Sequence, residues 1–528
     1  MKLILVALFS TLPSLTSSAA CPDYSSFSAQ RHEPLSTGKY ALSYQRPLPE
    51  CRTFNSSAVE STITRMTSPT VIADPDLARL FENTFPNTLD TAVRWHGHSA
   101  TDPNEELTFV ITGDINAMWL RDSANQLTSY QPLLPSSPSI ASLFRGAINL
   151  QARYILTSPF CNSFQPPPES GIPPASNSAA ATDSVFPSYN PSEVFECKFE
   201  LDSLAAFLQV STQYFHSSPS STVDFFSNFH WAEAVSSLLH TAKSMLSPTY
   251  DPVTGAVLPS PYTFTRQTTR STETLANNGA CSPVGNGTGL IRSAFRPSDD
   301  ATLFQLHVPA NMMFAAQLTS AADIASAIGE DAMASEMRAL AKAIRDGIEK
   351  YGTTHLSSRA PHSETAVETI YAYEVDGFGS AAVMDDANIP SLLSAPLFGY
   401  LSVNDAQYQR TRKRILTSHS LKSGGGNPYF MAGPVLSAVG GPHVGPGMAW
   451  PMALIVQIMT SEDEDEILGA LKQILRSTDG LGLVHESVDA FNASHWTRQW
   501  FSWANGLFGQ MILDLHARKP EILLCSFQ

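Results

Sequence analysis

The stretch DAMASEMRALAKAIRDGIEKY, residues 331–351, decides the fold class of this chain. Its apolar side chains recur every three or four residues, so that one stripe of an α-helix would carry Met333, Met337, Leu340, Ile344 and Ile348. A helix with one apolar stripe buries that stripe against its neighbours. The stretch therefore predicts an amphipathic helix packed into a helical core.

The same helical period recurs through most of the sequence, whereas strand-like alternation is sparse. Apolar stripes at this spacing occupy residues 79–93, 142–157, 200–214, 228–246, 309–328, 404–417, 465–476 and 501–516. No change of composition marks a long linker. We therefore expect residues 21–528 to form one large all-α domain.

One segment breaks the helical pattern. Residues 162–196, between Cys161 and Cys197, contain seven prolines and almost no apolar period. Such a Pro- and Ser-rich segment is typical of a surface insertion. We predict that a disulfide between the two flanking cysteines holds its ends together.

Residues 1–20 have the parts of a secretory signal peptide: Lys2, the apolar run LILVALF, and the small residues 18–20. The mature chain is expected to begin near Cys21 and to be secreted and extracellular. Six cysteines fit that compartment, where disulfides persist. Three sequons are candidate glycosylation sites: Asn55, Asn286 and Asn492.

The net charge of the chain limits which classes of partner it can bind. A net charge of −16 argues against a nucleic-acid partner, which would require a basic face. The acidic run EDEDE, residues 462–466, is interpreted as the solvated start of a helix. No stretch after the signal is long and apolar enough to span a membrane. We expect a monomer.

Carboxylates, arginines and large aromatic residues gather in several short motifs. This mixture suits a neutral ligand rich in hydroxyl groups, because carboxylates and arginine hydrogen bond to hydroxyls while tryptophan covers C–H faces. The motifs therefore predict a recessed carbohydrate site. They are TGDINAMWLRDSANQ (112–126), ECKFELDS (196–203), YEVDGFGS (373–380), MDDANIPS (384–391), HES (485–487) and TRQWFSWAN (497–505).

The motif FRPSDDATLF, residues 295–304, places Asp299 and Asp300 side by side. It has two interpretations: the acidic first turn of a helix capped by Ser298, or a working acid. Signatures of other chemistries are missing. There is no GxSxG and no HExxH, and His96 and His98 lack a third ligand motif, so no metal or cofactor is expected. A pair of carboxylic acids is what glycoside hydrolysis requires.

Five motifs together resemble glycoside hydrolase family 125, the metal-independent exo-α-1,6-mannosidases. The motifs run in order from about residue 70 to 516. The resemblance implies an (α/α)6 barrel, inversion of configuration, and removal of terminal α-1,6-linked mannose from an oligosaccharide or glycoprotein. The motifs are TGDINAMWLRDSANQ, FRPSDDAT…VPANMM, YAYEVDGFGS…MDDANIPSLL, GGPHVGPGMAW and HES…TRQWFSWANGLF.

The resemblance also implies roles for single residues. The general acid falls on Asp299 or Asp300, and the general base on Glu486. A helix start would lower the pKa of either aspartate, whereas burial or a like-charged neighbour would raise it, so the choice between them stays open. The residues implied near the sugar are Asp114, Trp119, Arg121, Asp122, Asp202, Arg296, His443, Trp450, His485, Arg498 and Trp500.

Two other functions are compatible with parts of this pattern. The first is a calcium-dependent helical-barrel α-mannosidase that cleaves other linkages, with calcium held by the acidic loops. The second is a carbohydrate-binding protein on the same scaffold without activity. The presence of both the RPSDD and the HES motifs argues against the second, because a lectin needs neither an acid nor a base.

Overall fold

The computed structural model of the protein describes residues 21–217, 219–357, 367–418 and 425–528. The predicted signal peptide lies outside the described residues. Every segment with a helical period overlaps an α-helix, which confirms the helical class. The stretch 79–93 does so only in part, because α3 ends at Thr84 and β1 begins at Val93. These helices are α3 (Pro75–Thr84), α5 (Pro138–Thr157), α6 (Leu201–Ser217), α8 (Trp231–Ser244), α9 (Val308–Ala327), α10 (Asp331–Tyr351), α11 (Ala406–Ile415), α13 (Glu464–Arg476) and α14 (Ser502–Arg518).

Five further helices were not predicted: α1 (Tyr24–Ser28), α2 (Ser57–Met66), α4 (Leu120–Thr128), α7 (Pro219–Asn228) and α12 (Pro451–Met459). Two of them, α4 and α12, are buried nearly all round. A helix buried on every side shows no amphipathic period. The sequence pattern therefore misses it.

The helix that carries the opening stretch behaves as predicted. In α10 the side chains of Met337, Leu340, Ile344 and Ile348 are buried, and Met333 packs half-buried against the same core. The acidic run at 462–466 is also a helix start, since Asp463 caps α13 through its side chain.

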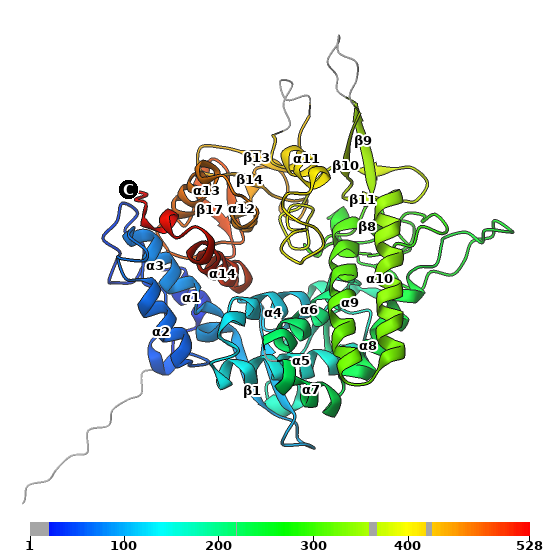
Figure 1. Ribbon diagram of the computed structural model, residues 1–528, viewed down its shortest axis with the longest axis horizontal. Helices are drawn as coiled ribbons and strands as arrows, with labels where there is room; N and C mark the ends of the chain where they lie inside the picture. Colours follow the sequence, from blue (N-terminus) through cyan, green and yellow to red (C-terminus); the bar gives the residue numbers. More distant parts are fainter. Residues whose placement is uncertain (1–20, 218, 358–366, 419–424) are drawn as a thin grey trace, which may run out of the picture.

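The helices follow one another around a ring (Figure 1). Helix α4 packs against α6 and α14, α6 against α9, and α14 against α12. Helices α5, α10 and α13 pack against α6, α9 and α12, respectively, and α8 packs against α5. The C-terminal helix α14 also contacts α3, so the two ends of the chain meet.

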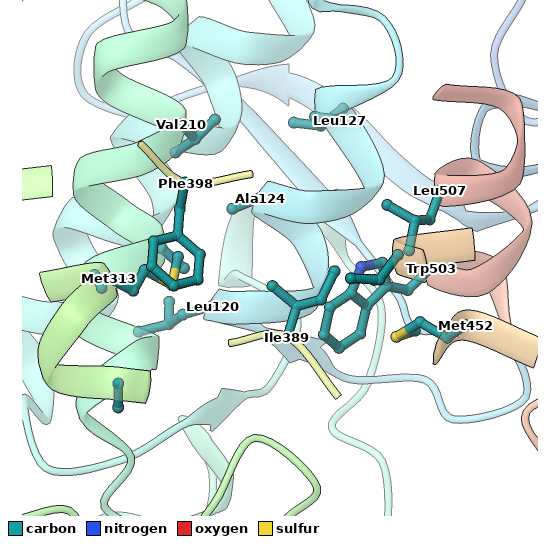
Figure 2. Close-up of a cluster of buried hydrophobic side chains, with 14 of the residues drawn as sticks. Leu120, Ala124, Leu127, Val210, Met313, Ile389, Phe398, Met452, Trp503 and Leu507 are labelled. Atoms are coloured by element: carbon teal, nitrogen blue, oxygen red, sulfur yellow. The ribbon is translucent and has the colours of Figure 1, made fainter. Parts of the chain in front are cut away.

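The centre of the ring is an apolar core to which α4, α6, α9, α12 and α14 all contribute (Figure 2). Leu120 of α4 lies near Met313 of α9, while Trp503 of α14 lies near Met452 of α12. Ile389 lies between these two groups and Phe398 lies beside Met313, and both enter the core from a segment without α-helix. The inner helices are thus held together by a shared core in which a loop takes part.

The described strands are short, and they were not predicted because two to six residues show little alternation. Three small sheets each lead into an inner helix: β3 (Met118–Trp119) precedes α4, β8 (Leu306–His307) precedes α9, and β15 (Met448–Ala449) precedes α12. Their partner strands are β4 (Ser163–Phe164), β6 (Val194–Glu196), β11 (Glu374–Val375), β12 (Ala381–Ala382), β16 (Ser487–Asp489) and β17 (Asn492–Thr497).

All pairings in these three sheets are antiparallel, as are those of four two-stranded sheets. The latter join β1 (Val93–His98) to β2 (Glu106–Val110), β5 (Ser184–Phe186) to β7 (Thr263–Thr265), β9 (Thr353–Ser357) to β10 (Val367–Tyr371), and β13 (Phe430–Ala432) to β14 (Ser437–Val439). In the described part of the chain, no helix has the length and hydropathy needed to cross a membrane.

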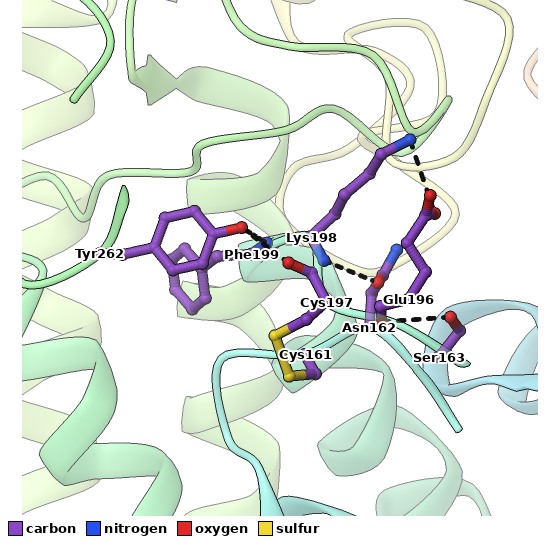
Figure 3. Close-up of a disulfide and its surroundings, with 8 residues drawn as sticks. All are labelled: Cys161, Asn162, Ser163, Glu196, Cys197, Lys198, Phe199 and Tyr262. Atoms are coloured by element: carbon purple, nitrogen blue, oxygen red, sulfur yellow. Dashed lines mark hydrogen bonds and ion pairs between the residues drawn. A yellow bond between two sulfur atoms is a disulfide. The ribbon is translucent and has the colours of Figure 1, made fainter. Parts of the chain in front are cut away.

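The predicted disulfide between Cys161 and Cys197 is present (Figure 3). It closes the Pro-rich insertion at its base, where β4 pairs with β6, and most side chains between 171 and 193 are exposed. A second disulfide joins Cys21 to Cys51, whereas Cys281 and Cys525 are free thiols.

Candidate active site

A recessed pocket lies where the segments that precede the inner helices converge. It encloses about 400 Å³ of space, its open mouth included. Eight residues singled out in the sequence line it: Trp119, Arg121, Asp122, Asp299, His443, Trp450, Glu486 and Arg498. The rest of its lining consists of Thr112, Ile115, Pro297, Ser298, Asn388, Phe501 and Trp503.

The RPSDD motif forms a tight loop, so the interpretation as a helix start is wrong. The next helix, α9, begins only at Val308. The loop is closed by an isolated bridge between Phe295 and Ala301 and by a hydrogen bond from the Arg296 N–H to the Asp300 carbonyl (2.8 Å). Asp299 sits at its tip with φ of 63°, in the left-handed region that aspartate tolerates better than most residues.

The two adjacent aspartates face different surroundings. Asp299 lines the pocket, and its Oδ1 accepts hydrogen bonds from Asn162 Nδ2 (3.0 Å) and Trp119 Nε1 (3.3 Å). Asp300 is not part of the lining and is almost fully buried. It accepts a hydrogen bond from Ser298 Oγ (3.1 Å), and its Oδ1 lies 3.5 Å from His443 Nδ1.

His443 carries a positive charge at neutral pH. Partial burial lowers the pKa of its imidazole, but the hydrogen bond and the charge of Asp300, together with the charge of Glu486, outweigh burial and raise the pKa to about 9. The second aspartate of the motif thus holds a cation at the pocket wall.

Arg121 stands at the centre of a buried carboxylate cluster behind Asp299. Its Nη1 lies 2.5 Å from Glu200 Oε2 and 3.3 Å from Asp202 Oδ2. Its Nη2 lies 3.1 Å from Asp122 Oδ2 and 3.8 Å from Asp299 Oδ1. Four carboxyl groups around one guanidinium cannot all be ionised at low cost.

As a consequence, some carboxyl groups of the cluster have raised pKa values and Asp299 has a lowered one. Burial raises the pKa of Glu200 well above its ordinary range against the pull of Arg121, and the charge of Asp299 raises it further. Burial likewise raises the pKa of Asp202 to about 6. Burial also disfavours the charged form of Asp299, but Arg121 and Lys198 outweigh it and lower the pKa of Asp299 to about 2.

Glu486 immediately precedes β16 and lines the same pocket. Thr497 Oγ1 donates a hydrogen bond to its Oε2 (2.8 Å), and Arg498 Nη1 donates one to its Oε1 (3.3 Å). Arg498 in turn donates from Nε to Asp114 Oδ1 (2.8 Å). The pairing of β16 with β17 fixes this group, because Glu486 N–H also donates to the Arg498 carbonyl (3.3 Å).

Some predicted residues lie outside the lining of this pocket. Asp202 is buried beneath Arg121. Arg296 pairs with Glu374 (2.6 Å) in the interior, and His485 is stacked on Trp496 with ring centroids 4.7 Å apart. Asp114 and Trp500 line a second, neighbouring and larger cavity of about 1070 Å³, its open mouth included.

Three residues that hold Asp299 were not singled out as site residues: Asn162, Lys198 and Glu200. The Cys161–Cys197 disulfide places two of them, because Asn162 and Lys198 directly follow its cysteines (Figure 3). The Lys198 N–H donates to Asn162 Oδ1 (3.1 Å), which turns the amide Nδ2 toward Asp299. A disulfide predicted from the sequence therefore indicates that the residues next to its cysteines, here Asn162 and Lys198, can lie at the site.

The residues described here include no group of three or more His, Cys, Asp or Glu side chains arranged to hold a metal ion. His96 bonds instead to Thr108 Oγ1 (2.9 Å) and Ser142 Oγ (3.0 Å). The pocket itself presents carboxyl groups that can carry acid–base chemistry. Asp299 and Glu486 come from distant parts of the chain and face one space, flanked by Arg121, His443 and Arg498.

Comparison with known proteins agrees with this chemistry. A family described as metal-independent α-mannosidase (GH125) matches residues 74–513. The meiotically up-regulated gene 157 protein of Schizosaccharomyces pombe is 45% identical over 504 residues, which are 96% of this chain and 94% of that protein. A solved structure from the metal-independent α-mannosidases, that of Streptococcus pneumoniae in a non-productive complex with α-1,6-mannobiose, is 31% identical. Its TM-score is 0.75, over 88% of this chain and 100% of that one.

Proposed function

Since the chain belongs to glycoside hydrolase family 125, the metal-independent α-mannosidases, we propose that it is a secreted, exo-acting, inverting α-mannosidase. It would remove terminal α-1,6-linked mannose from an oligosaccharide or glycoprotein, as a monomer on an (α/α)6 barrel. The observation that carries the proposal is that Asp299 and Glu486, nearly two hundred residues apart in sequence, line one recessed pocket.

In this proposal Asp299 is the general acid and Glu486 the general base. Asp299 protonates the glycosidic oxygen as the C1–O bond breaks, and Glu486 takes a proton from the water that attacks C1 from the opposite face. Asp300 is the poorer candidate for the acid, since it lies behind the wall and bonds to Ser298 and His443. An inverting enzyme needs a separation of roughly 6.5–9.5 Å between the two carboxyl groups.

The other lining residues fit a single sugar ring. The volume of about 400 Å³ includes the open mouth of the pocket, so the enclosed space is small, which favours one terminal residue and an exo mode of attack. Trp450, Trp503 and Phe501 supply apolar surface for C–H faces, and Arg121 and Arg498 supply donors for hydroxyls. Asp114 orients Arg498 from the neighbouring cavity.

The α-1,6 linkage is proposed from the Streptococcus pneumoniae structure, whose ligand is α-1,6-mannobiose. The direct test is incubation of the secreted protein with α-1,2-, α-1,3- and α-1,6-linked mannobiose, with and without EDTA, and with chromatography of the released mannose. We expect release from the α-1,6 isomer, with unchanged rates after exhaustive chelation, because the proposed chemistry needs only carboxyl groups.

Three outcomes would contradict parts of this proposal. Preference for another isomer would overturn the linkage. Loss of activity with EDTA, and its return with calcium, would favour a calcium-dependent α-mannosidase. Binding of mannobiose without cleavage would favour a carbohydrate-binding protein.

A further inference from the structure

The carboxyl group of Glu200 lies directly behind that of Asp299, out of reach of solvent. Glu200 stands just before α6, and its side chain has no exposed surface. Its Oε2 accepts hydrogen bonds from Arg121 Nη1 (2.5 Å) and Ser203 Oγ (3.2 Å). Its Oε1 is buried without a donor among the described residues, and the carboxyl group of Asp299 lies within hydrogen-bonding reach.

Two carboxyl groups in such contact share one proton, because neither ionised group has a hydrogen to donate and the two charges repel. Glu200 is the side on which that proton rests in the free enzyme. Asp299 already has two donors on its Oδ1, from Asn162 and Trp119, which favour its ionised form. The raised pKa of Glu200 and the lowered pKa of Asp299 agree with this distribution.

We infer that Glu200 stores the proton that Asp299 delivers to the leaving group. As the C1–O bond breaks, its electron pair goes to the glycosidic oxygen. The single proton of the Glu200–Asp299 pair passes from Glu200 to Asp299 and from Asp299 to that oxygen, which leaves both carboxyl groups ionised. The attacking water passes one proton to Glu486, which releases it to solvent. After the product leaves, the pair recovers one proton from solvent through Asp299, whose side chain is 25% exposed.

This inference rests on the proposed function and explains a difficulty in it. An aspartate held ionised by its neighbours is a poor acid, because it has no proton to donate. A proton shared with the buried Glu200 gives Asp299 one to pass to the leaving group. The charged groups that face the pair are the buried Arg121, Asp202 and Lys198, and Asp122 and His443, which line the pocket.

The test compares Glu200→Gln on two substrates. α-1,6-Mannobiose needs protonation of its leaving group, whereas α-mannosyl fluoride does not, because fluoride leaves as a stable anion. We expect kcat/KM for mannobiose to fall on the order of tenfold to hundredfold, part of what a general acid contributes. The rate with the fluoride should stay within a few-fold of wild type. A purely structural role would lower both rates alike.

The pH profile gives a second readout. In the reactive form, Glu200 and Asp299 together hold one proton. Activity is lost when the pH rises and that proton dissociates. Without Glu200 the proton must reside on Asp299, whose pKa the neighbouring cations depress. The alkaline limb for mannobiose should therefore move to lower pH in Glu200→Gln, and Glu200→Asp should restore part of the wild-type profile.

Asp202→Asn is the matched control, since Asp202 is equally buried and contacts the same Arg121 nitrogen without touching Asp299. It should lower kcat/KM for both substrates by the same factor. Because the charge of Asp202 only helps to raise the pKa of Glu200, the alkaline limb should move less than in Glu200→Gln. Equal losses of kcat/KM on both substrates in Glu200→Gln, or an alkaline limb of the pH profile that does not move, would overturn the inference. Either result would leave the proposed function intact. A wild type inactive on both substrates would overturn both. If Glu200→Gln does not fold, the comparison is made with Glu200→Asp alone, which should show a smaller loss confined to mannobiose.

Discussion

Glu486→Gln is expected to lower kcat for α-1,6-mannobiose by about 10²–10⁴-fold, the contribution typical of a general base. The amide keeps the size of the carboxylate and can still meet Thr497 and Arg498, so the pocket should keep its shape. It cannot take a proton from water. Turnover should therefore be lost while binding of mannobiose, measured by calorimetry, changes little.

The matched control is Glu349→Gln, the same chemical change at an exposed position of α10. It should leave kcat and binding unchanged. If Glu486→Gln keeps more than a tenth of wild-type turnover with a melting temperature like that of wild type, Glu486 is not the base. Loss of binding together with turnover would instead make Glu486 a residue that holds the sugar.

Asp299→Asn should have the second largest effect, a loss of about 10²–10⁴-fold on α-1,6-mannobiose. The asparagine amide can fill the same place beside Asn162 and Trp119 but has no proton acid enough to give to the leaving oxygen. With α-mannosyl fluoride the loss should be far smaller. The comparison separates protonation of the leaving group from binding of the sugar.

Asp300→Asn provides the comparison within the motif. It removes the charge that keeps His443 protonated, so the pKa of His443 should fall from about 9 and the imidazole should lose its charge at lower pH. We expect a smaller loss, of similar size on both substrates. If Asp300→Asn is the variant rescued by the fluoride and Asp299→Asn is not, the assignment of the acid between the two must be exchanged.

The sequence predicted the parts of the fold that have one apolar face. The stripe of α10 is visible because one side of that helix faces solvent. In α12 nearly every side chain is buried, so no period remains to be read. The small sheets that lead into the inner helices depend on partners far along the chain, as when β15 pairs with β16.

The candidate site was predicted in its motifs more than in its geometry. Pro297 and Ser298 before two acidic residues are typical of a helix start, yet the loop closes through Phe295 and Ala301 and projects Asp299 into the pocket. Nothing local separates Asp299 from Asp300. The contacts that distinguish them, with Asn162 and His443, come from other segments.

The residues behind the pocket illustrate the same limit. Arg296 and His485 belong to the RPSDD and HES motifs, but their side chains turn into the interior, toward Glu374 and the Thr478 carbonyl. Glu200 was visible in the ECKFELDS motif without a role. The role that we propose for it rests on its burial against Arg121 and Asp299, which only the folded chain provides.

The stereochemistry of the first product tests the central claim most directly. Wild-type protein is mixed with α-1,6-mannobiose at high enzyme concentration, and the anomeric proton of released mannose is followed by nuclear magnetic resonance before mutarotation. A single displacement by water, with Glu486 as base and Asp299 as acid, predicts that β-mannose appears first. Appearance of α-mannose first would contradict this account, because it would require a covalent intermediate and a nucleophile in place of the base.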